Sequence, residues 1–233
     1  MNTLQHQIPL PLNPIKKASF EGFFTAQNQV SIAYLKDLKI AKDTKWPIIT
    51  GPTGSGKSHL LNALLKQYDG DSVLLDLKDT RWKPEHINQL NHFTLIAIDN
   101  LHHIFGSLEW EEAIFHLYNQ LRQCHHTLAI TLEKPSQHYQ LALPDLASRL
   151  TWGIQLELKP INKEDLSEYL KFLAQKNYIE LSEKTRAYIL THSSRNAGDL
   201  ATLMNHIASK SLSLKKKPSI PMIRSIIESP LYF

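Results

Sequence analysis

The sequence is poor in cysteine and lacks long apolar runs. Its single cysteine, Cys124, cannot form an internal disulfide or a cysteine-based zinc site. No apolar run approaches the roughly 18 residues that a membrane helix needs. The N-terminus also lacks the basic-then-apolar layout of a signal peptide. We therefore expect a protein of the reducing cytoplasm that has no membrane partner.

The balance of charge is also weak. A formal net charge of +4 permits contact with nucleic acid but does not argue for it. Twelve histidines are present, yet none lies at a metal-ligand spacing near a carboxylate, so we expect solvated or capping histidines. A hydrophobic content of 42% is enough for a real core.

Glycine is scarce, but it is concentrated in one segment. Three of the eight glycines lie in Gly51-Pro52-Thr53-Gly54-Ser55-Gly56-Lys57-Ser58, which fits the phosphate-binding loop pattern G-x-x-x-x-G-K-[ST]. Residues 46–50 read as a buried strand that enters the loop, and residues 59–66 as the helix that leaves it. Such a loop directs backbone N–H groups and a helix N-terminus at phosphate oxygens. The segment predicts a site for ADP or ATP in which Lys57 reaches the β- and γ-phosphates and Ser58 ligates Mg²⁺.

The pattern along the chain predicts an α/β domain followed by a helical one. Near-continuous apolar runs that read as strands lie at residues 46–50, 72–77, 93–100, 127–131 and 153–158. Helical spacing lies between them, which is typical of a five-stranded parallel sheet covered by helices on both faces. An amphipathic helix is also expected over residues 27–40, with an apolar face formed by Val30, Ala33, Tyr34, Leu35 and Leu38.

After Pro160 only helical patterns remain, which indicates a small all-α lid domain. We therefore expect a tail over residues 1–19, a nucleotide-binding domain over 20–160 and a lid over 161–233. The run Lys215-Lys216-Lys217 ends a predicted helix, where cations favour the helix dipole. Contact with a DNA backbone is the alternative.

Two residues at the end of the third strand concern the chemistry. Asp99 lies where a Mg²⁺-coordinating acid is needed, either directly or through water. Many hydrolytic proteins with this loop place an acid at the next position, but this chain has Asn100. A carboxamide can orient water but cannot accept its proton, so we expect tight binding and little turnover. The full set of predicted nucleotide contacts is Gly51, Pro52, Thr53, Gly54, Ser55, Gly56, Lys57, Ser58, His59, Asp99 and Asn100.

Two further charged residues are candidates for roles in the reaction. Glu133 lies just past the fourth strand, where it could position water or sense the γ-phosphate, although it could also be simply solvated. Arg149 closes the helix predicted over residues 144–150. A guanidinium supplied from outside a site accelerates phosphoryl transfer, but the spacing alone leaves Arg149 as a surface residue.

The N-terminal tail is unlike the rest of the chain. Prolines at 9, 11 and 14 forbid a helix, and Gln7-Ile8-Pro9-Leu10-Pro11-Leu12 carries apolar side chains that a free terminus normally lacks. These residues are either a strap on the chain's own domain or a linear motif whose Gln and Leu side chains enter pockets on a partner.

Together these segments resemble the AAA+ ATPases of the bacterial replication-initiator branch. They are most similar to the Hda family of DnaA-related regulatory inactivation proteins. The resemblance rests on Asp99-Asn100, on Ala113-Ile114-Phe115-His116-Leu117-Tyr118-Asn119, on Leu146-Ala147-Ser148-Arg149-Leu150-Thr151-Trp152-Gly153 and on the N-terminal motif. It extends over essentially the whole chain.

The resemblance implies roles for several residues. Arg149 would be an arginine finger acting in trans and Glu133 a sensor-1 residue. The tail would bind the β sliding clamp of DNA polymerase III through Gln7, Ile8, Leu10, Pro11 and Leu12. The implied partners are the DnaA initiator, the clamp and, through the clamp, DNA and the nucleoid. Self-association is left open.

The resemblance implies an ADP-bound negative regulator of replication initiation that stimulates hydrolysis of DnaA-bound ATP. A self-sufficient ATPase of the helicase-loader type and a clamp-bound adaptor are the alternatives. The chain departs from this branch at one expected residue, the sensor-2 arginine early in a lid helix. The corresponding position in this chain is Gly198, and Arg195 lies three residues earlier. The chain stops at Phe233 without a helix-turn-helix domain, so we expect no direct reading of origin sequence.

Overall fold

The computed structural model describes residues 18–42 and 45–229. The chain forms two compact units. Among the described residues, the first comprises 18–23 and those of Gln29–Pro52 and Lys57–Leu158, and the second comprises Phe24–Asn28, Thr53–Gly56 and 159–229.

A five-stranded parallel sheet organises the first unit. Its strands are β1 (Pro47–Thr50), β2 (Ser72–Asp76), β3 (Leu95–Asp99), β4 (Thr127–Leu132) and β5 (Ile154–Glu157). They lie in the order β2-β3-β4-β1-β5, and every neighbouring pair is parallel. The strands β1 to β4 are largely apolar because helices cover both faces of the sheet there, whereas Gln155 and Glu157 of the edge strand β5 are exposed. The predicted fold class is confirmed.

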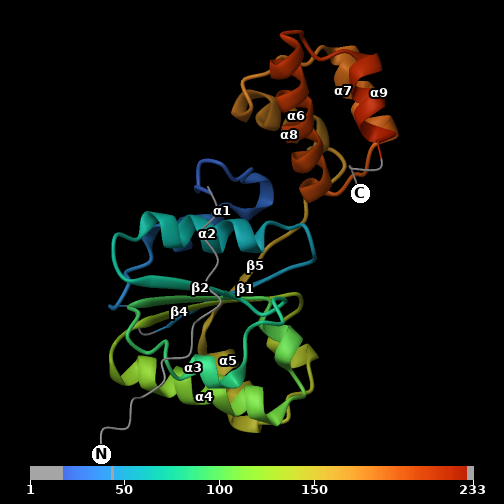
Figure 1. Ribbon diagram of the computed structural model, residues 1–233. Coiled ribbons are helices and arrows are strands. Elements are labelled where there is room, and N and C mark those ends of the chain that lie inside the picture. The colour runs from blue at the N-terminus through green and yellow to red at the C-terminus, as the bar shows by residue number, and fades with distance from the viewer. Residues whose placement is uncertain (1–17, 43–44, 230–233) are drawn as a thin grey trace, which may run out of the picture. The chain divides into compact units, whose positions relative to one another are not determined.

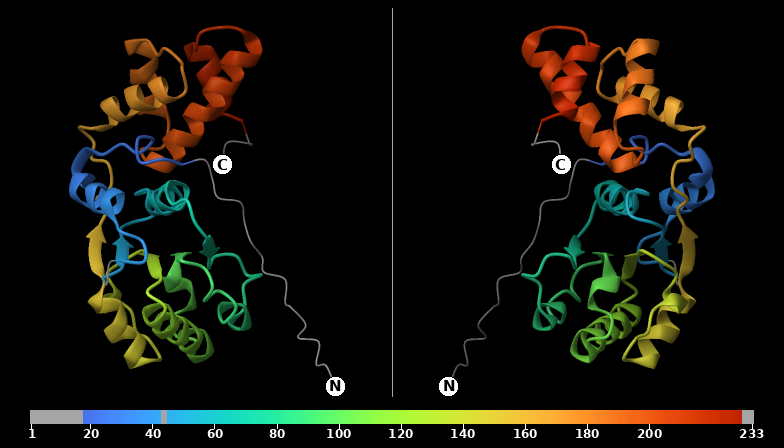
Figure 2. Two further views of the ribbon diagram at one scale, coloured as in Figure 1. Left: turned by 90° about the vertical axis from the view of Figure 1, so that its left-hand side faces the viewer. Right: turned by 90° about the vertical axis from the view of Figure 1, so that its right-hand side faces the viewer.

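Helices form a layer on each face of this sheet. The helices α1 (Gln29–Asp37) and α2 (Lys57–Gln67) lie on one face, and α3 (Pro84–Ile87), α4 (Leu108–Gln123) and α5 (Pro144–Trp152) lie on the other (Figure 1). The side views in Figure 2 show the same layers of this unit. Three 3₁₀ turns also occur, at Ala26–Asn28, Leu101–Ile104 and Ser136–His138.

Alternation along the strands creates two separate cores in the first unit. Ile48 of β1 packs with Ile114 and Leu117 of α4 in one core. The next residue, Ile49, packs with Leu60 and Leu64 of α2 in the other. Successive side chains of a strand point to opposite faces, so β1 to β4 contribute to both cores. The edge strand β5 contributes Ile154 and Leu156 to the second core alone.

The prediction for the first helix is partly wrong. The helix α1 is shorter than the predicted range 27–40, and Val30 is 83% exposed. Leu35 and Leu38 of the predicted face are buried as expected, and Ile32, which the prediction left out, is buried as well. A residue advances about 100° around a helix, so Val30 lies roughly 200° from Ile32 and about 140° from Leu35. It therefore cannot share their buried face.

The second unit contains four α-helices among its described residues. They are α6 (Leu166–Lys176), α7 (Glu183–His192), α8 (Ala197–Leu214) and α9 (Ile220–Ile227). They surround one apolar core that includes Leu170, Ile189, Leu203 and Ile223. Two of the helices begin at side-chain caps, because Ser182 accepts from the Thr185 N–H and Asn196 from the Gly198 and Asp199 N–H groups. Among the described residues, no helix is long and apolar enough to cross a membrane.

Candidate nucleotide-binding site

The phosphate-binding loop directly follows β1 and leads into α2. Its glycines adopt positive φ angles of 149° at Gly51, 83° at Gly54 and 94° at Gly56. Other residues reach this region only with strain, which explains the glycine cluster in the sequence. The helix α2 begins at Lys57, so its first N–H groups lie at the loop with no intrahelical partner. Such a helix start favours anions.

Lys57 is a buried cation within this loop, with only 7% of its surface exposed. Its Nζ donates to the carbonyl oxygens of Gly51 at 2.6 Å and Pro52 at 3.0 Å. Burial lowers the pKa of Lys57 below its usual value, and the carboxylates of Asp99 and Glu133 oppose that shift. Among the described residues Lys57 forms no ion pair, so its charge is poorly compensated and fits a phosphate ligand.

Ser55 supplies a second sign of fit to a polar ligand. The Ser55 Oγ is buried and has no hydrogen-bond partner within the described part of the chain. Buried polar atoms without partners are uncommon and call for an explanation. Phosphate oxygens at the loop would provide the missing acceptor.

Asp99 ends β3 beside a threonine of β4. The Asp99 carboxylate is buried and accepts a short hydrogen bond from Thr131 Oγ. Thr131 Oγ also accepts the Asn100 N–H at 2.8 Å. Thr131 therefore fixes both the carboxylate and the backbone at the carboxyl edge of the sheet, where ligands bind in parallel α/β folds.

The side chain of Asn100 is already engaged within the protein. Asn100 has a left-handed backbone with φ 59°, and its Nδ2 donates to Asp76 Oδ1 at 2.9 Å. Asn100 therefore connects the ends of β3 and β2. A carboxamide held in this way offers no base for the activation of water.

Glu133 lies just past the end of β4, near a histidine that the sequence analysis did not identify. Its Oε2 is 3.8 Å from His102 Nε2. Burial first, and His103 second, lower the pKa of His102, while Glu133 raises it. The ring of His102 also stacks on Tyr139, with centroids 5.9 Å apart.

Ser58 and His59 occupy the first turn of α2. Ser58 is exposed, whereas His59 Nε2 lies 2.9 Å from the Ser19 carbonyl oxygen. The His59 ring also packs against Phe23, so this histidine ties the start of α2 to the N-terminal segment. Its predicted contact with nucleotide stays a prediction.

The Mg²⁺ site expected at Ser58 and Asp99 also stays a prediction. Within residues 18–42 and 45–229 there is no group of three or more His, Cys, Asp or Glu side chains that could hold a metal by itself. A hydroxyl and one carboxylate fit Mg²⁺, which usually keeps several waters and shares its remaining ligands with phosphate oxygens.

Arg149 lies in the last turn of α5. It is near the amino ends of the strands, whereas the phosphate-binding loop lies at their carboxyl ends. Its guanidinium is 4.6 Å from the Trp152 ring and 5.9 Å from the Tyr118 ring. Tyr118 in turn packs on Trp46, which immediately precedes β1. The phosphate-binding loop follows the other end of β1, so Arg149 and the loop are separated by the length of the strand, on the order of 10 Å.

The remaining predicted residues are less informative. Arg195 is exposed just before α8, and Gly198 lies in the first turn of that helix, so neither is assigned a role. The expected clamp-binding residues Gln7, Ile8, Leu10, Pro11 and Leu12 lie outside the described residues.

Three contributors to the site were missed from the sequence: Asp76, His102 and Thr131. Only Thr131 left a signal, as a polar side chain near the carboxyl end of an otherwise apolar strand. Its partners depend on how β4 aligns with β3, where Ile98 pairs with Ile130. That register is not encoded in any local pattern.

Comparison with known proteins agrees with this geometry. Residues 163–227 match the family model described as Hda, lid domain. Domain III of the Thermotoga maritima replication initiation protein DnaA is similar with a TM-score of 0.72 and 21% identity, over 94% of this chain and 100% of that one.

Other solved structures share the fold. AMPPCP-bound DnaA from Aquifex aeolicus has a TM-score of 0.69 and 21% identity, over 87% of this chain and 68% of its own. The Thermotoga maritima RuvB Holliday junction branch migration motor has a TM-score of 0.59 and 16% identity, over 86% and 67%. These identities establish the fold alone, and the more specific match is that of the lid. The chain thus shares the fold of DnaA domain III, and its residues 163–227 match the model of the Hda lid domain, which confirms the resemblance seen in its sequence.

Proposed function

We propose that this chain is a nucleotide-bound negative regulator of replication initiation that stimulates hydrolysis of DnaA-bound ATP. In this proposal the chain holds ADP, the N-terminal motif binds the DNA-loaded β sliding clamp, and Arg149 acts on the nucleotide of the initiator. The family of the lid and the DnaA-like fold support the general role.

The position of Arg149 is the single observation that carries the proposal. The guanidinium lies at the amino edge of the sheet, near Trp46, whereas the chain's own phosphate loop follows the carboxyl end of β1. A side chain so placed acts on a phosphate only if that phosphate belongs to another molecule. An arginine supplied in trans contributes about 10³ to 10⁵ to the rate of phosphoryl transfer.

The aromatic contacts of Arg149 also suit a finger. Stacking on Trp152 restrains the long side chain, so less rotamer entropy is lost when the guanidinium meets phosphate oxygens. The planar fork then forms paired hydrogen bonds with the oxygens on which negative charge develops.

The chain's own nucleotide site is suited to binding more than to hydrolysis. Backbone N–H groups at the start of α2 and the ammonium of Lys57 would neutralise the phosphates, and Ser58 and Asp99 would hold Mg²⁺. Bound Mg²⁺ supplies charge neutralisation between phosphate oxygens. Asn100 is bonded to Asp76 and offers no base, so bound nucleotide persists and stabilises the fold.

Tethering to the clamp would increase how often this chain meets the initiator. A motif that binds the clamp would raise the local concentration of Arg149 near clamp-bound DNA without any new contact to the initiator. In this role the residues Gln7, Ile8, Leu10, Pro11 and Leu12 affect stimulation only when the clamp is present.

The test measures hydrolysis of DnaA-bound ATP with this protein, clamp and DNA. Arg149→Ala is expected to abolish stimulation while nucleotide and clamp binding persist. The matched control is Arg122→Ala, an exposed arginine on α4. A double change, Gln7→Ala with Leu10→Ala, is expected to abolish the dependence on the clamp.

Other outcomes would support the alternatives. Rapid ATP turnover by the purified chain alone would indicate a self-sufficient ATPase of the helicase-loader type. Normal stimulation by Arg149→Ala would leave a clamp-bound adaptor, and the proposed role of the arginine would be wrong.

A further inference from the structure

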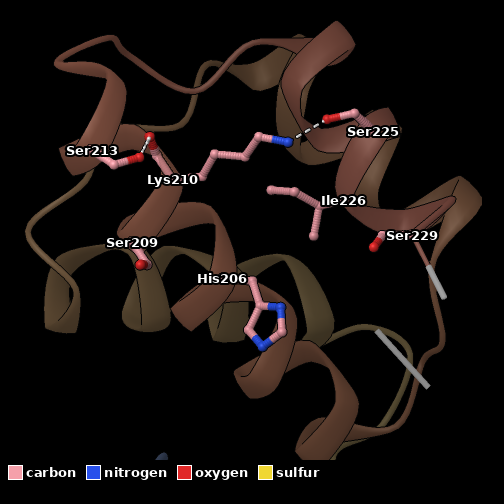
Figure 3. A pocket seen from close by; sticks show the side chains of 7 residues that line it. All are labelled: His206, Ser209, Lys210, Ser213, Ser225, Ile226 and Ser229. Atoms are coloured by element: carbon pink, nitrogen blue, oxygen red, sulfur yellow. Dashed lines mark hydrogen bonds between the residues drawn. The ribbon is translucent and has the colours of Figure 1, made fainter. Parts of the chain in front are cut away.

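Two hollows flank the C-terminal half of α8 in the second unit. One lies between α8 and α9, has a volume of about 440 Å³, and is shown in Figure 3. The other has a volume of about 750 Å³ and lies between α8 and the segment that follows α6. Ser209 borders both hollows, so they adjoin at this residue of α8. We call the two hollows together the α8 groove.

Lysines dominate the charge of the α8 groove. Its charged lining residues, His206 aside, are Lys210, Lys215, Lys216, Lys217 and Glu180. Glu180 pairs with Lys217 at 2.7 Å, whereas Lys215 and Lys216 form no ion pair among the described residues. The C-terminal ends of α6 and α8 add a partial charge of about −0.5 each. The four lysines outweigh these ends and the single acid together, so the groove suits an anionic partner.

Hydroxyl groups accompany these lysines. In the smaller hollow Lys210 extends from α8 and donates to Ser225 Oγ of α9 at 2.7 Å (Figure 3). Ser209 and Ser213 lie on the same stretch of α8. Serine hydroxyls and lysine ammonium groups are common donors to phosphate oxygens in nucleic-acid complexes.

Two residues with strained backbones also line the larger hollow. Tyr178 has φ 56° and Lys215 has φ 51°, and each follows the end of a helix in a Schellman motif. The Ile179 N–H bonds to the Ala174 carbonyl, and the Lys216 N–H bonds to that of Ser211. Glycine is the usual residue at such positions because a Cβ atom costs about 1–2 kcal/mol there.

The identity of these two residues suggests a binding role. Tyr178 is 97% exposed, and an aromatic ring so exposed gains little from packing in the free protein. Backbone strain that is retained at exposed side chains is a reason to consider function. A tyrosine and a lysine at the two helix ends supply one stacking surface and one cation to the same hollow.

We propose that the α8 groove binds single-stranded nucleic acid. The lysines and serines contact successive phosphates, and Tyr178 stacks on an unpaired base, which is the usual combination in single-strand binding without sequence preference. A duplex would leave the tyrosine without a role, because its bases are already stacked. An acidic peptide would use the lysines but not a flat aromatic surface. This site is independent of the proposed action on DnaA.

Fluorescence anisotropy with an oligo-dT probe tests the proposal on the full chain. The double change Lys215→Ala with Lys216→Ala is expected to weaken binding roughly tenfold at low salt and to reduce the slope of log K against log salt by about 1.4. The control with the same change in charge is Lys163→Ala with Lys184→Ala, two exposed lysines of the same unit outside the groove. It is expected to bind within about twofold of the parent.

A second pair of variants separates binding from folding. Tyr178→Gly and Lys215→Gly relieve the left-handed backbone, so the unfolding temperature is expected to stay level or to rise. Affinity for oligo-dT is nevertheless expected to fall, about fivefold or more for Tyr178→Gly, because stacking is lost. A purely structural role for these side chains predicts no loss of affinity.

The remaining outcomes overturn the proposal. Equal weakening in the groove and control variants would mean diffuse attraction without a site. Duplex DNA that binds as tightly as oligo-dT, with no effect of Tyr178→Gly, would exclude single-strand recognition. Competition by poly-glutamate at equal charge concentration would show that any acidic chain is bound.

Discussion

Asn100 depends on Asp76 for the position of its side chain, through an Nδ2–Oδ1 distance of 2.9 Å. Changing Asn100→Asp replaces the donor with a second carboxylate facing the first. We expect the free energy of unfolding to fall by about 2 kcal/mol, since a hydrogen bond to a charged group is lost and like charges are opposed. Urea denaturation at neutral pH measures the change.

Exchanging the two residues provides the control for this prediction. In the double variant Asp76→Asn with Asn100→Asp, donor and acceptor are reversed and the charge is conserved. Most of the lost stability should return, as a double-mutant cycle would reveal. Equal losses in the single and double variants would mean that the contact between these side chains contributes little.

His102 gives the candidate site a pH dependence. Burial lowers its pKa, so between that value and the ordinary one of about 6.5 the folded chain binds fewer protons than the unfolded chain. Stability therefore falls as the pH drops through this range. When the pH is lowered from about 7.5 to about 5.5, the unfolding temperature of His102→Gln should fall less than that of the parent protein. His116→Gln, an exposed histidine on α4, should behave as the parent does.

At the scale of residues, the sequence predicted the groups that belong to a motif. The loop could be located because it fits a motif of fixed spacing, and Asp99 and Asn100 because they end an apolar strand downstream of that loop. Thr131 and Asp76 could not, because they join the site only through the pairing of β4 and β2 with β3. Those pairings follow from packing of the whole sheet and leave no local signature.

Single elements are held in place by buried polar groups, and Glu111 of α4 is the clearest case. Its side chain is fully buried, and its two oxygens accept the Gly106 and Leu143 N–H groups at 2.7 Å each. Leu143 is the N-cap residue that immediately precedes α5, and α5 carries Arg149. Glu111 therefore positions the start of the helix that holds the proposed finger.

Glu111→Gln should weaken this anchor. An amide nitrogen cannot accept a hydrogen bond, so one N–H is left without its acceptor, and we expect a loss of about 2 kcal/mol in the free energy of unfolding. Stimulation of the initiator should also fall, but less than with Arg149→Ala. Glu112→Gln, at the exposed neighbouring position, is the matched control. An unchanged stability would contradict the assigned contacts.

A helix or strand could be predicted from the sequence when its residues are all buried or follow one clear apolar face. The sheet strands were found because burial on both faces makes them continuous apolar runs, as in residues 95–99. The apolar face of α1 was predicted correctly at Leu35 but wrongly at Val30, and Ile32 was missed, because the apolar residues are spread around the helix and packing in the core with α2 decides which are buried. Glu111 was missed because an acid on a helix is usually solvated.

For the whole molecule, the change of pattern at Pro160 marks where helices replace strands, but the second unit also includes distant segments. Asn28 illustrates why. Its side chain donates to the Lys159 carbonyl at 3.0 Å and accepts the Lys159 N–H at 2.8 Å. Both residues belong to the second unit although 131 positions separate them. A contact of this range is set by the folded chain and not by local composition.

Binding of nucleotide should stabilise the whole chain by mass action. At a free ADP concentration of about 100 times Kd, the expected gain is about 2.7 kcal/mol. For a chain of this size that gain corresponds to a rise of roughly 5–10 °C in the unfolding temperature. Lys57→Ala should abolish the rise, since it removes the buried cation of the loop. Scanning fluorimetry with and without ADP and Mg²⁺ measures the shift.

The matched control is Lys66→Ala, an exposed lysine at the far end of the same helix, α2, which should keep the full shift. Chelation of Mg²⁺ should reduce the shift if Ser58 and Asp99 hold the ion together with the phosphates. Because Asn100 provides no base, samples with ATP should keep their elevated unfolding temperature over hours and release little phosphate. A shift that survives Lys57→Ala would place the nucleotide elsewhere in the molecule, and rapid release of phosphate would mean that another group activates water.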